Sequence, residues 1–577
     1  MPKVIIVGAG WFGLIAAQTY LAIHPTHTLL ILESSSNLGG TWSRTRVYRG
    51  MVTHNAIGAL EISSHPLKNG TPTAEKYIRG EDVAEYLHTL AKKYDLYERI
   101  RYNSSVTAIT RNPLTREWLL KVVKADGSVE EESCEKLIMA TGMTSTPFTP
   151  TDIPVTNPTM KLIHCGDLGE HQNYLEGPTV NHVTIYGGSK SAFDAAYMCA
   201  AAGKKVDWVA RTTGQGVAAM FTAKSLGTTS ALLGPKRFFN ALNPCIYNRT
   251  TLVSRFLHGT AFGRSLIWFY WKTLTNITWK KHGLHTSSNG RKLIPDLGEL
   301  GPFWSGSTPT GVISQPDFWS YIHPADAPVT VHRAEIASIS GNTVRLSNGT
   351  TFTPDAHIWG TGWIRNSSPL GIEDPSLALD AGVPVPLPLV PKPTTEHWEH
   401  LETVANELVL STFPLLSNPP PYRVIPRTHT PYRLYRLIAP PAMAARGDNN
   451  LAFVGMLHTS ATGMMAELQA LWAVAYLDGK VDLRERGANG VETQQEMETE
   501  VAETSMWARR RYLNLGEKSG NLTFEFMPYF DTLLRDLGLE PRRKRGWFKE
   551  WFGSYSPRDY AGITQELVAG HYVSDED

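Results

Sequence analysis

The chain has 577 residues, of which 42% are hydrophobic, so it is long enough for roughly two to four domains with sizeable cores. Its 55 basic and 54 acidic side chains almost cancel, and the composition therefore gives no electrostatic support for nucleic-acid binding. The four cysteines are widely spaced and form no Cys-x-x-Cys motif, which argues against a zinc site or a redox disulfide and favours a reducing compartment.

The first residues have the pattern of a nucleotide-binding turn. Residues 4–7 are apolar and suit a strand that is buried on both faces. Gly8, Gly10 and Gly13 follow in Gly-x-Gly-x-x-Gly spacing, and an apolar helical stretch begins directly after them. The first glycine permits a tight turn, the second lets the backbone approach a pyrophosphate, and the third packs the helix against the strand. We therefore expect these glycines to form a dinucleotide site.

A second strand, expected over residues 28–32, ends in Glu33, whose carboxylate can accept hydrogen bonds from ribose hydroxyls. A glycine pair then brings Gly40 and Thr41 close to the cofactor, and Trp42 offers a flat surface beside it. The alternative, an ordinary glycine-rich turn, fits the acidic residue at the end of the second strand less well.

The first unit continues with a mixture of elements. We expect an amphipathic helix over residues 81–98 and hairpin-like strands around 106–109 and 118–123. A short strand over 137–139 then leads to Gly142, which follows a small residue and a threonine. A strand that delivers a small residue and a glycine onto a bound dinucleotide would close this unit.

The same pattern starts again near residue 183. A second strand is followed by the turn residues Gly187, Gly188, Ser189, Lys190 and Ser191, and an alanine, still small enough for helix packing, replaces the third glycine.

The strand after this second turn, expected over 206–210, ends in Arg211 instead of an acid. An arginine there can pair with a 2′-phosphate, so we expect this half to prefer NADP over NAD, with Lys190 assisting. The alternative for Arg211 is a solvated surface charge.

A long detour, about residues 213–300, delays the closing strand of the second unit until residues 356–362. The detour is a natural candidate for substrate-channel or lid material. Its apolar run at 266–271 is shorter than the roughly 18 residues of a membrane span, and we favour burial of this run in the core over contact with a membrane surface.

Late sequence is expected to complete the first unit. The proline-rich residues 383–393 should form an extended connector. A strand over 451–454 and a helix from about 464 to 476 suit a return to the first domain. The predicted fold class is α/β, with two Rossmann-like dinucleotide-binding domains, the second inserted into the first and carrying a helical insertion.

Taken together, these stretches resemble the class B flavin-dependent monooxygenases, the group related to flavin-containing monooxygenases and Baeyer–Villiger enzymes. The resemblance covers most of the chain except the detour and the last hundred or so residues. Residues 53–66 resemble a fungal branch, many of whose members oxidise secondary metabolites. The residues that carry the resemblance are 8–13, Glu33, 39–42, 140–142, 187–191, Arg211, 360–362 and 467–470.

The resemblance implies the cofactors and the reaction. FAD would bind the first turn and NADPH the second, with domain boundaries at 1–178 for the first part of the FAD domain, 179–362 for the NADP domain and 363–577 for the return to the FAD domain and a C-terminal helical region. NADPH would reduce FAD, and the reduced flavin would take up dioxygen to form a hydroperoxyflavin that oxygenates a small organic molecule. Nitrogen, sulfur, ketone and alkene oxygenation all stay open.

The resemblance also assigns residues beside the flavin, although two positions depart from the family pattern. Thr53 and Val106 would contact FAD. His54 stands where the family has asparagine, with Asn55 next, and either side chain would be catalytic by holding the flavin and the oxygen intermediate through hydrogen bonds. A satisfied polar residue in a turn is the alternative for both. The family's bridging sequence is altered between His164 and His171, where the second histidine comes one residue late.

Three rival functions are less consistent with these residues. A disulfide reductase needs a redox cysteine pair, an FAD oxidase makes no use of Arg211, and a non-catalytic flavoprotein would require His54 and the altered bridging sequence to abolish turnover. A strand beginning near residue 3 leaves no room for a signal peptide, so we expect a cytoplasmic protein with a small-molecule substrate and dioxygen as partners. The aromatic run and the aromatic, basic C-terminal tail would allow peripheral membrane contact.

Overall fold

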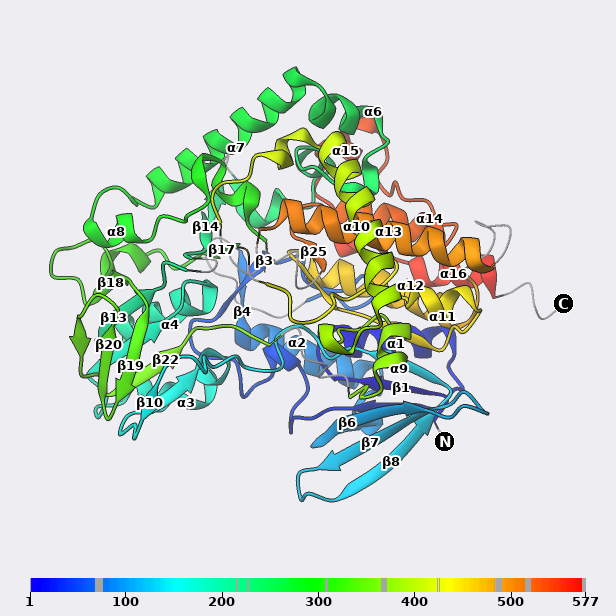
Figure 1. Cartoon of the computed structure of the whole chain (residues 1–577), viewed down its shortest axis with the longest axis horizontal. Helices are drawn as coiled ribbons and strands as arrows, with labels where there is room; N and C mark the ends of the chain where they lie inside the picture. The colour runs from blue at the N-terminus through cyan, green and yellow to red at the C-terminus, as the bar shows by residue number, and fades with distance from the viewer. Residues whose placement is uncertain are drawn as a thin grey trace.

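The computed structural model describes residues 2–67, 76–213, 216–225, 228–306, 310–364, 371–422, 424, 426–481, 483, 490–513 and 520–572 (Figure 1). A five-stranded parallel sheet in the order β23-β9-β1-β2-β5 forms the first unit. The edge strand β23 comes far later in the chain than its neighbour β9, so the predicted completion of this sheet by late sequence is confirmed. The strands are β1 (Val4–Val7), β2 (Leu29–Leu32), β5 (Ile100–Arg101), β9 (Lys136–Met139) and β23 (Leu451–Phe453).

A second five-stranded parallel sheet, in the order β11-β22-β12-β13-β18, forms between β9 and β23 in the sequence. The predicted pair of Rossmann-like units, one inserted into the other, is therefore confirmed. The domain boundaries stay a prediction, and β11 joins the second sheet from ahead of residue 179. The strands are β11 (Lys161–His164), β12 (His182–Tyr186), β13 (Lys205–Ala210), β18 (Val329–Arg333) and β22 (Ala356–Trp359).

Helices cover both sheets, as parallel strands with two buried faces require. Every residue of β1 and β22 is buried. Helix α1 packs against α12, which follows β23, so an N-terminal helix and a late helix share one core. These helices are α1 (Trp11–Ile23), α2 (Gly80–Lys93), α3 (Leu168–Glu176), α4 (Lys190–Ala201) and α12 (Thr462–Leu477).

Smaller sheets surround these two units. The predicted hairpin strands form an antiparallel sheet of β6 (Ser104–Arg111), β7 (Trp118–Lys124) and β8 (Val129–Cys134). The remaining strands are β3 (Val52–Ala56), β4 (Tyr77–Arg79), β10 (Val155–Thr156), β14 (Ala219–Thr222), β15 (Lys224–Ser225), β16 (Thr228–Thr229), β17 (Thr310–Ile313), β19 (Ile336–Ser340), β20 (Thr343–Leu346), β21 (Thr351–Phe352), β24 (Leu457–Thr459) and β25 (Gly520–Leu522).

The detour begins with short strands and continues as helices along the upper edge of Figure 1. In its longest helix, Ile267 and Trp271 are buried, as predicted, whereas Leu266 and Phe269 are exposed. The expectation that the whole aromatic run is buried is therefore wrong, because a helix, with 3.6 residues per turn, distributes an uninterrupted apolar run around its whole circumference. The helices are α5 (Arg237–Ala241), α6 (Leu252–Ser254), a π-helical turn (Arg255–Gly259), α7 (Ala261–Lys281) and α8 (Ser288–Lys292).

The proline-rich stretch is extended only in part. Residues 387–389 form a 3-10 turn, and α10 begins at Lys392, inside the predicted connector. This boundary was predicted wrongly because proline is tolerated in the first turn of a helix, where its missing N–H has no partner to lose. The other late helices are α9 (Pro375–Asp380), α10 (Lys392–Thr412), α11 (Pro441–Ala445), α13 (Gly490–Arg511), α14 (Phe526–Asp536), α15 (Trp547–Phe552) and α16 (Ile563–His571). None of the described helices is long and apolar enough to cross a bilayer.

Candidate active site

The three glycines of the first turn have two different structural roles. A Cβ atom at Gly8 would lie 2.6 Å from the carbonyl oxygen of Ala140, and one at Gly13 would lie 1.9 Å from the carbonyl oxygen of Gly8. At Gly10 the nearest heavy atom to a Cβ would be the Cα of Gly40, at 3.8 Å. Gly8 and Gly13 therefore allow strand, turn and helix to pack, while Gly10 leaves the open space beside the backbone that a pyrophosphate requires.

Glu33 fixes the shape of this turn. Its carboxylate accepts hydrogen bonds from the backbone N–H groups of Ala9 (2.7 Å) and Ser35 (2.8 Å) and from the Ser34 hydroxyl (3.4 Å), and the side chain is buried. A carboxylate has about four acceptor sites, so these bonds still leave room for a ribose hydroxyl. The geometry fits the predicted role and adds a structural one.

The remaining first-unit candidates lie around the same sheet edge. Gly40, Thr41 and Trp42 form a 3-10 turn, and the Thr41 hydroxyl is 2.8 Å from that of Thr144, just beyond Gly142. Val106 lies on β6, which starts beside β2 because the Ser104 N–H donates to the carbonyl oxygen of Glu33 (2.9 Å).

A cavity of about 310 Å³ brings together residues from distant parts of the sequence. The first unit contributes Trp42 and the β3 residues Thr53, His54 and Asn55, and the second contributes Lys190 and Ser191. The detour and the C-terminal region close the cavity with apolar side chains. Among the lining residues that the sequence did not single out are Phe221, Leu274, Ser460 and Phe524.

His54 and Asn55 occupy different environments in this cavity. The Asn55 amide donates a 2.7 Å hydrogen bond to the carbonyl oxygen of Ser460, which ties β3 to the loop after β24. The His54 ring has no hydrogen-bond partner within the described part of the chain. Burial, with a smaller contribution from the Lys190 ammonium, lowers the His54 pKa to about 3, so the imidazole is neutral near pH 7. A neutral ring can donate one hydrogen bond and accept another.

The second glycine turn is more tightly filled by protein than the first. A Cβ at Gly187 would lie 2.1 Å from the carbonyl oxygen of Gly360, and one at Gly188 would lie 2.4 Å from that of Gly216. Ser189 is the N-cap residue of α4, so Lys190 and Ser191 open the helix that faces the cavity.

The Lys190 ammonium points into a polar cluster at the cavity wall. It pairs with the carboxylate of Asp194, which also accepts a 2.8 Å hydrogen bond from the Tyr48 hydroxyl. The structure thus places Lys190 beside the His54 environment, and its predicted assistance to Arg211 stays a prediction.

Arg211 follows the last residue of β13, and a second arginine ends the neighbouring strand. Arg333 is the register partner of Ala210, so both arginines lie at the carboxyl edge of the second sheet. One guanidinium nitrogen of Arg333 pairs with Asp296, and another is buried without a hydrogen-bond partner among the described residues. Sequence reasoning missed Arg333, although it ends a short strand-like stretch, Val329-Thr-Val-His-Arg333, as Arg211 follows one. Finding it required knowing that β13 pairs with β18.

The altered bridging sequence connects β11 to the closing loop of the second unit. His164 accepts a hydrogen bond at Nδ1 from the N–H of Gly166 (3.0 Å), and its Nε2 lies 2.9 Å from the carbonyl oxygen of Gly362. Its ring packs edge-on against Trp363. His171 lies on α3, one helix further along the chain.

All four cysteines are buried and unpaired. Burial raises the pKa of each thiol, so each is protonated near neutral pH. A disulfide-reductase mechanism, which needs a reactive thiol pair, has no residues to carry it here.

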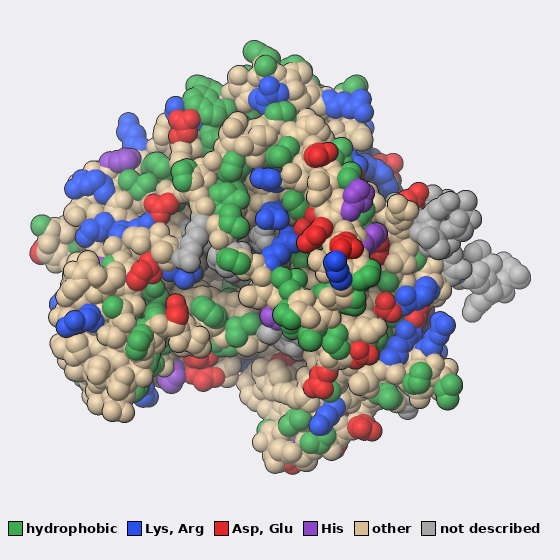
Figure 2. Space-filling model, in the orientation of Figure 1, with side chains coloured by type: hydrophobic (Ala, Val, Ile, Leu, Met, Phe, Trp, Pro, Cys, Tyr) green, Lys and Arg blue, Asp and Glu red, His purple; other side chains and the backbone are tan. Residues whose placement is uncertain are grey.

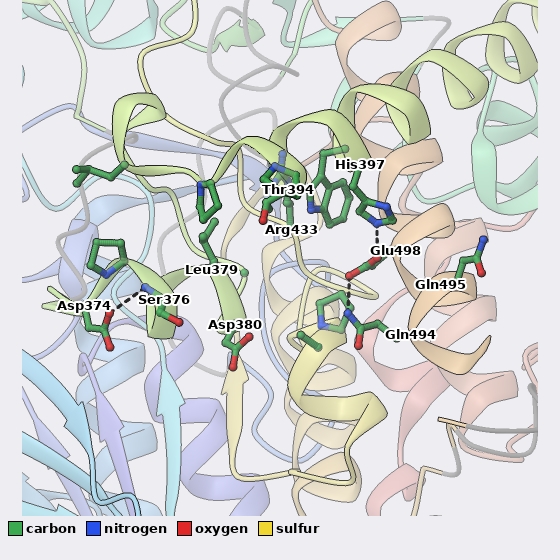
Figure 3. A pocket seen from close by; sticks show the side chains of 18 residues that line it. Asp374, Ser376, Leu379, Asp380, Thr394, His397, Arg433, Gln494, Gln495 and Glu498 are labelled. Atoms are coloured by element: carbon green, nitrogen blue, oxygen red, sulfur yellow. Dashed lines mark hydrogen bonds and ion pairs between the residues drawn. The ribbon is translucent and has the colours of Figure 1, made fainter. Parts of the chain in front are cut away.

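A larger groove, of about 1050 Å³, lies between α9, α10, α11 and α13 (Figure 3). In this groove His397 Nε2 is 2.7 Å from a carboxylate oxygen of Glu498, and the Arg433 guanidinium stacks 4.0 Å from the Trp398 ring centre, with two of its nitrogens buried without a hydrogen-bond partner among the described residues. None of the predicted site residues lines this groove. Volume alone therefore does not identify the active site, and the smaller cavity lined by residues of both units is the candidate.

Comparison with known proteins agrees with this geometry. A family model described as pyridine nucleotide-disulphide oxidoreductase matches residues 5–226. The FAD-dependent monooxygenase rstn6 of Aspergillus nomiae is 35% identical over all of this chain and 99% of its own length. The FAD-dependent monooxygenase DEP4 of Alternaria brassicicola is 34% identical over 98% of this chain and 94% of its own.

Solved structures show the same fold at low sequence identity. A polycyclic ketone monooxygenase from the fungus Thermothelomyces thermophila aligns with a TM-score of 0.61 at 12% identity, over 92% of this chain and 87% of its own. A steroid monooxygenase bound to NADP aligns with a TM-score of 0.58 at 16% identity, over 94% and 98%. The predicted resemblance is confirmed by the full-length relatives, and the chain belongs to the family of FAD-dependent monooxygenases.

Proposed function

We propose that the first glycine turn holds FAD and that the second binds NADPH, so that the two cofactors meet at the cavity lined by His54 and Lys190. The observation that carries this proposal is the convergence of Trp42 and β3 of the first unit with Lys190 and Ser191 of the second turn on that one cavity. The open space at Gly10 supports the position of the FAD pyrophosphate. When bound, the cofactors supply the redox chemistry, and the protein supplies orientation, hydrogen bonds and exclusion of water.

Arg211 and Arg333 together form the proposed site for the 2′-phosphate of NADPH. Both are at the carboxyl ends of adjacent parallel strands, where open α/β sheets bind their ligands. The carboxylate of Glu335 accepts hydrogen bonds from the backbone N–H groups of Thr212 (2.9 Å) and Thr213 (3.1 Å). These bonds stabilise its negative charge within the protein, so it is not free to pair with the two arginines.

The substrate is proposed to be a small, largely apolar organic molecule, such as an intermediate of secondary metabolism. Phe221, Phe239, Leu274 and Phe524 contribute to the apolar cavity wall. Of the predicted pair, the Asn55 amide is already hydrogen-bonded, whereas the His54 ring has no hydrogen-bond partner among the described residues. His54 is assigned the role of holding the reacting groups by hydrogen bonds. Asn55 is a positioning residue, since its amide is already bonded to Ser460.

Isotopic labelling tests the proposed oxygen transfer. The FAD-loaded protein is given NADPH, labelled dioxygen and a panel of ketones, sulfides, amines and alkenes, and products are analysed by mass spectrometry. We expect at least one substrate class to gain a single labelled oxygen atom for each NADPH oxidised. Recovery of all consumed oxygen as hydrogen peroxide across the panel would favour the oxidase alternative. His54→Gln should keep more of the labelled product than His54→Ala, because the amide also donates and accepts.

We infer a cytoplasmic location, supported by the four unpaired thiols, with peripheral association to a membrane.

A further inference from the structure

The detour carries an excess of positive charge. Residues 213–300 contain eleven lysines and arginines against two acidic residues, Asp296 and Glu299. The rest of the chain holds 44 basic and 52 acidic residues, so the near-neutral total hides a separation of charge. A surface of one sign attracts a partner of the opposite sign.

An exposed apolar face runs along the same segment. In α7, Phe262, Leu266 and Phe269 follow i, i+4, i+7 spacing and point outward, with Phe262 and Phe269 each 66% exposed. Leu252 and Phe256, just before α7, are 83% and 48% exposed. The opposite face of α7 is buried and includes Leu274, which lines the cavity.

A second exposed aromatic pair lies on α15. Trp547 and Phe548 are 70% and 69% exposed and follow the basic run 542–545 after one glycine. Helix α5 of the detour connects α15 to α7, because Phe238 contacts Phe552 of α15 (5.2 Å between ring centres) and Phe239 contacts Trp271 of α7 (6.2 Å). Figure 1 places α6, α7 and α15 along one edge of the molecule, and Figure 2 shows hydrophobic and basic side chains mixed along that edge.

Several cations around these residues have no ion-pair partner among the described residues. Arg237 and Arg249 are paired with carboxylates of other segments, and Lys272 is paired with Glu299 at the end of the detour. In contrast, no carboxylate of the described chain pairs with the side chains of Arg255, Lys280, Arg542 or Arg545. Lys280 lies on the outward face of α7, about 27 Å from Phe262 along the helix.

We propose that Leu252, Phe256, Phe262, Leu266, Phe269, Trp547 and Phe548, here called the apolar patch, insert into the interface of an anionic membrane. Exposed aromatic and aliphatic side chains would enter the headgroup boundary, and the unpaired lysines and arginines would contact anionic lipid headgroups. This combination of apolar side chains flanked by cations favours an anionic bilayer over a protein partner or a second copy of the chain, whose matching patch would carry the same positive charge.

The proposed docking gives α7 two functions. Its outer face would lie in the lipid interface while its inner face lines the cavity, and the diameter of a helix, roughly 10 Å, separates the two. This consequence rests on the proposed function, because it places the entry of an apolar substrate beside the bilayer. Membrane binding itself is measured without turnover, so it can fail or succeed independently of oxygen transfer.

Vesicle co-sedimentation of the FAD-loaded, full-length protein tests the proposal. We expect binding to phosphatidylcholine vesicles containing about 30% phosphatidylserine to exceed binding to pure phosphatidylcholine by roughly tenfold or more, and to fall at high salt. Phe262→Ser combined with Phe269→Ser should lower the partition coefficient about tenfold. The matched control is Leu114→Ser with Val129→Ser, two exposed apolar residues on the β6–β8 sheet, which should bind as the unaltered protein does.

FAD content and melting temperature establish that each variant is folded. Equal binding to both vesicle types, no binding to either, or equal losses in the patch and control variants would overturn the proposal. Light scattering supplies an independent check. A dimer that dissociates on the Phe262→Ser/Phe269→Ser change would assign the apolar patch to a second copy of the chain and would also overturn it.

Discussion

Replacing Arg211 by alanine should weaken use of NADPH much more than use of NADH. A hydrogen bond to a charged group contributes about 1.5–3 kcal/mol, which corresponds to roughly a 10- to 150-fold loss in kcat/KM. Arg333→Ala should cost less, about 3- to 30-fold, because this arginine already has a partner in Asp296. That partner is more than half exposed, and an exposed ion pair competes by at most about 1 kcal/mol.

Steady-state kinetics with both nucleotides at two ionic strengths measure these losses. Arg345→Ala, an exposed arginine on β20 of the same unit, is the matched control and should leave both nucleotides unaffected. The double variant Arg211→Ala/Arg333→Ala should lose less than the product of the single losses if both side chains bind one phosphate. Equal losses with NADPH and NADH would refute the assignment, since NADH lacks the group that the arginines are proposed to hold.

Four further substitutions test the roles of the first turn and of two buried titratable groups. Gly13→Ala should lower the free energy of unfolding by about 3 kcal/mol, because its Cβ meets a carbonyl oxygen. Gly10→Ala should instead keep the melting temperature of the FAD-free protein and lower FAD affinity at least about tenfold, because its Cβ would enter the space left for the cofactor. Equal melting temperatures of the two FAD-free variants would contradict this contrast. Burial raises the pKa of Glu467 to about 7, so the folded state loses stability as pH rises from about 4.5 through 7. Glu467→Gln should therefore raise the free energy of unfolding by up to about 3 kcal/mol at pH 8 but change it little at pH 4.5. Denaturant unfolding at the two pH values measures this difference. Burial lowers the pKa of His357 to about 3, so the unfolded state gains a proton at this residue as pH falls below about 6.5 while the folded state does not. His357→Leu should therefore reduce the drop in melting temperature between pH 7.5 and 5. An unchanged drop would show that His357 does not contribute to the loss of stability in acid.

The features that could be predicted from the sequence are those that local chemistry dictates. A buried strand, a glycine turn and an apolar helix occupy consecutive residues, so the turns at Gly8 and Gly187 and the residues that end the next strands, Glu33 and Arg211, could be located without the fold. The return of β23 to the first sheet followed from the same pattern recurring late in the chain.

The features that could not be predicted depend on contacts between distant segments. Arg333 became a candidate only through the pairing of β13 with β18, and Ser460 and Phe524 only through closure of the cavity. The two faces of α7 could not be separated by composition, because an uninterrupted aromatic run has no polar residue to mark its outer side.

The environment of His54 explains how a histidine can stand where related enzymes are expected to have asparagine. A charged imidazole would be a donor at both nitrogens, unlike an amide, which is neutral and both donates and accepts. Burial and the Lys190 ammonium lower the His54 pKa to about 3, so this ring offers the same neutral donor and acceptor that an amide would. Lys190 belongs to the second glycine turn and His54 to the first unit. The His54 ring is therefore kept neutral mainly by its burial, with a smaller contribution from a lysine of the other unit, and a neutral ring can replace an amide as donor and acceptor.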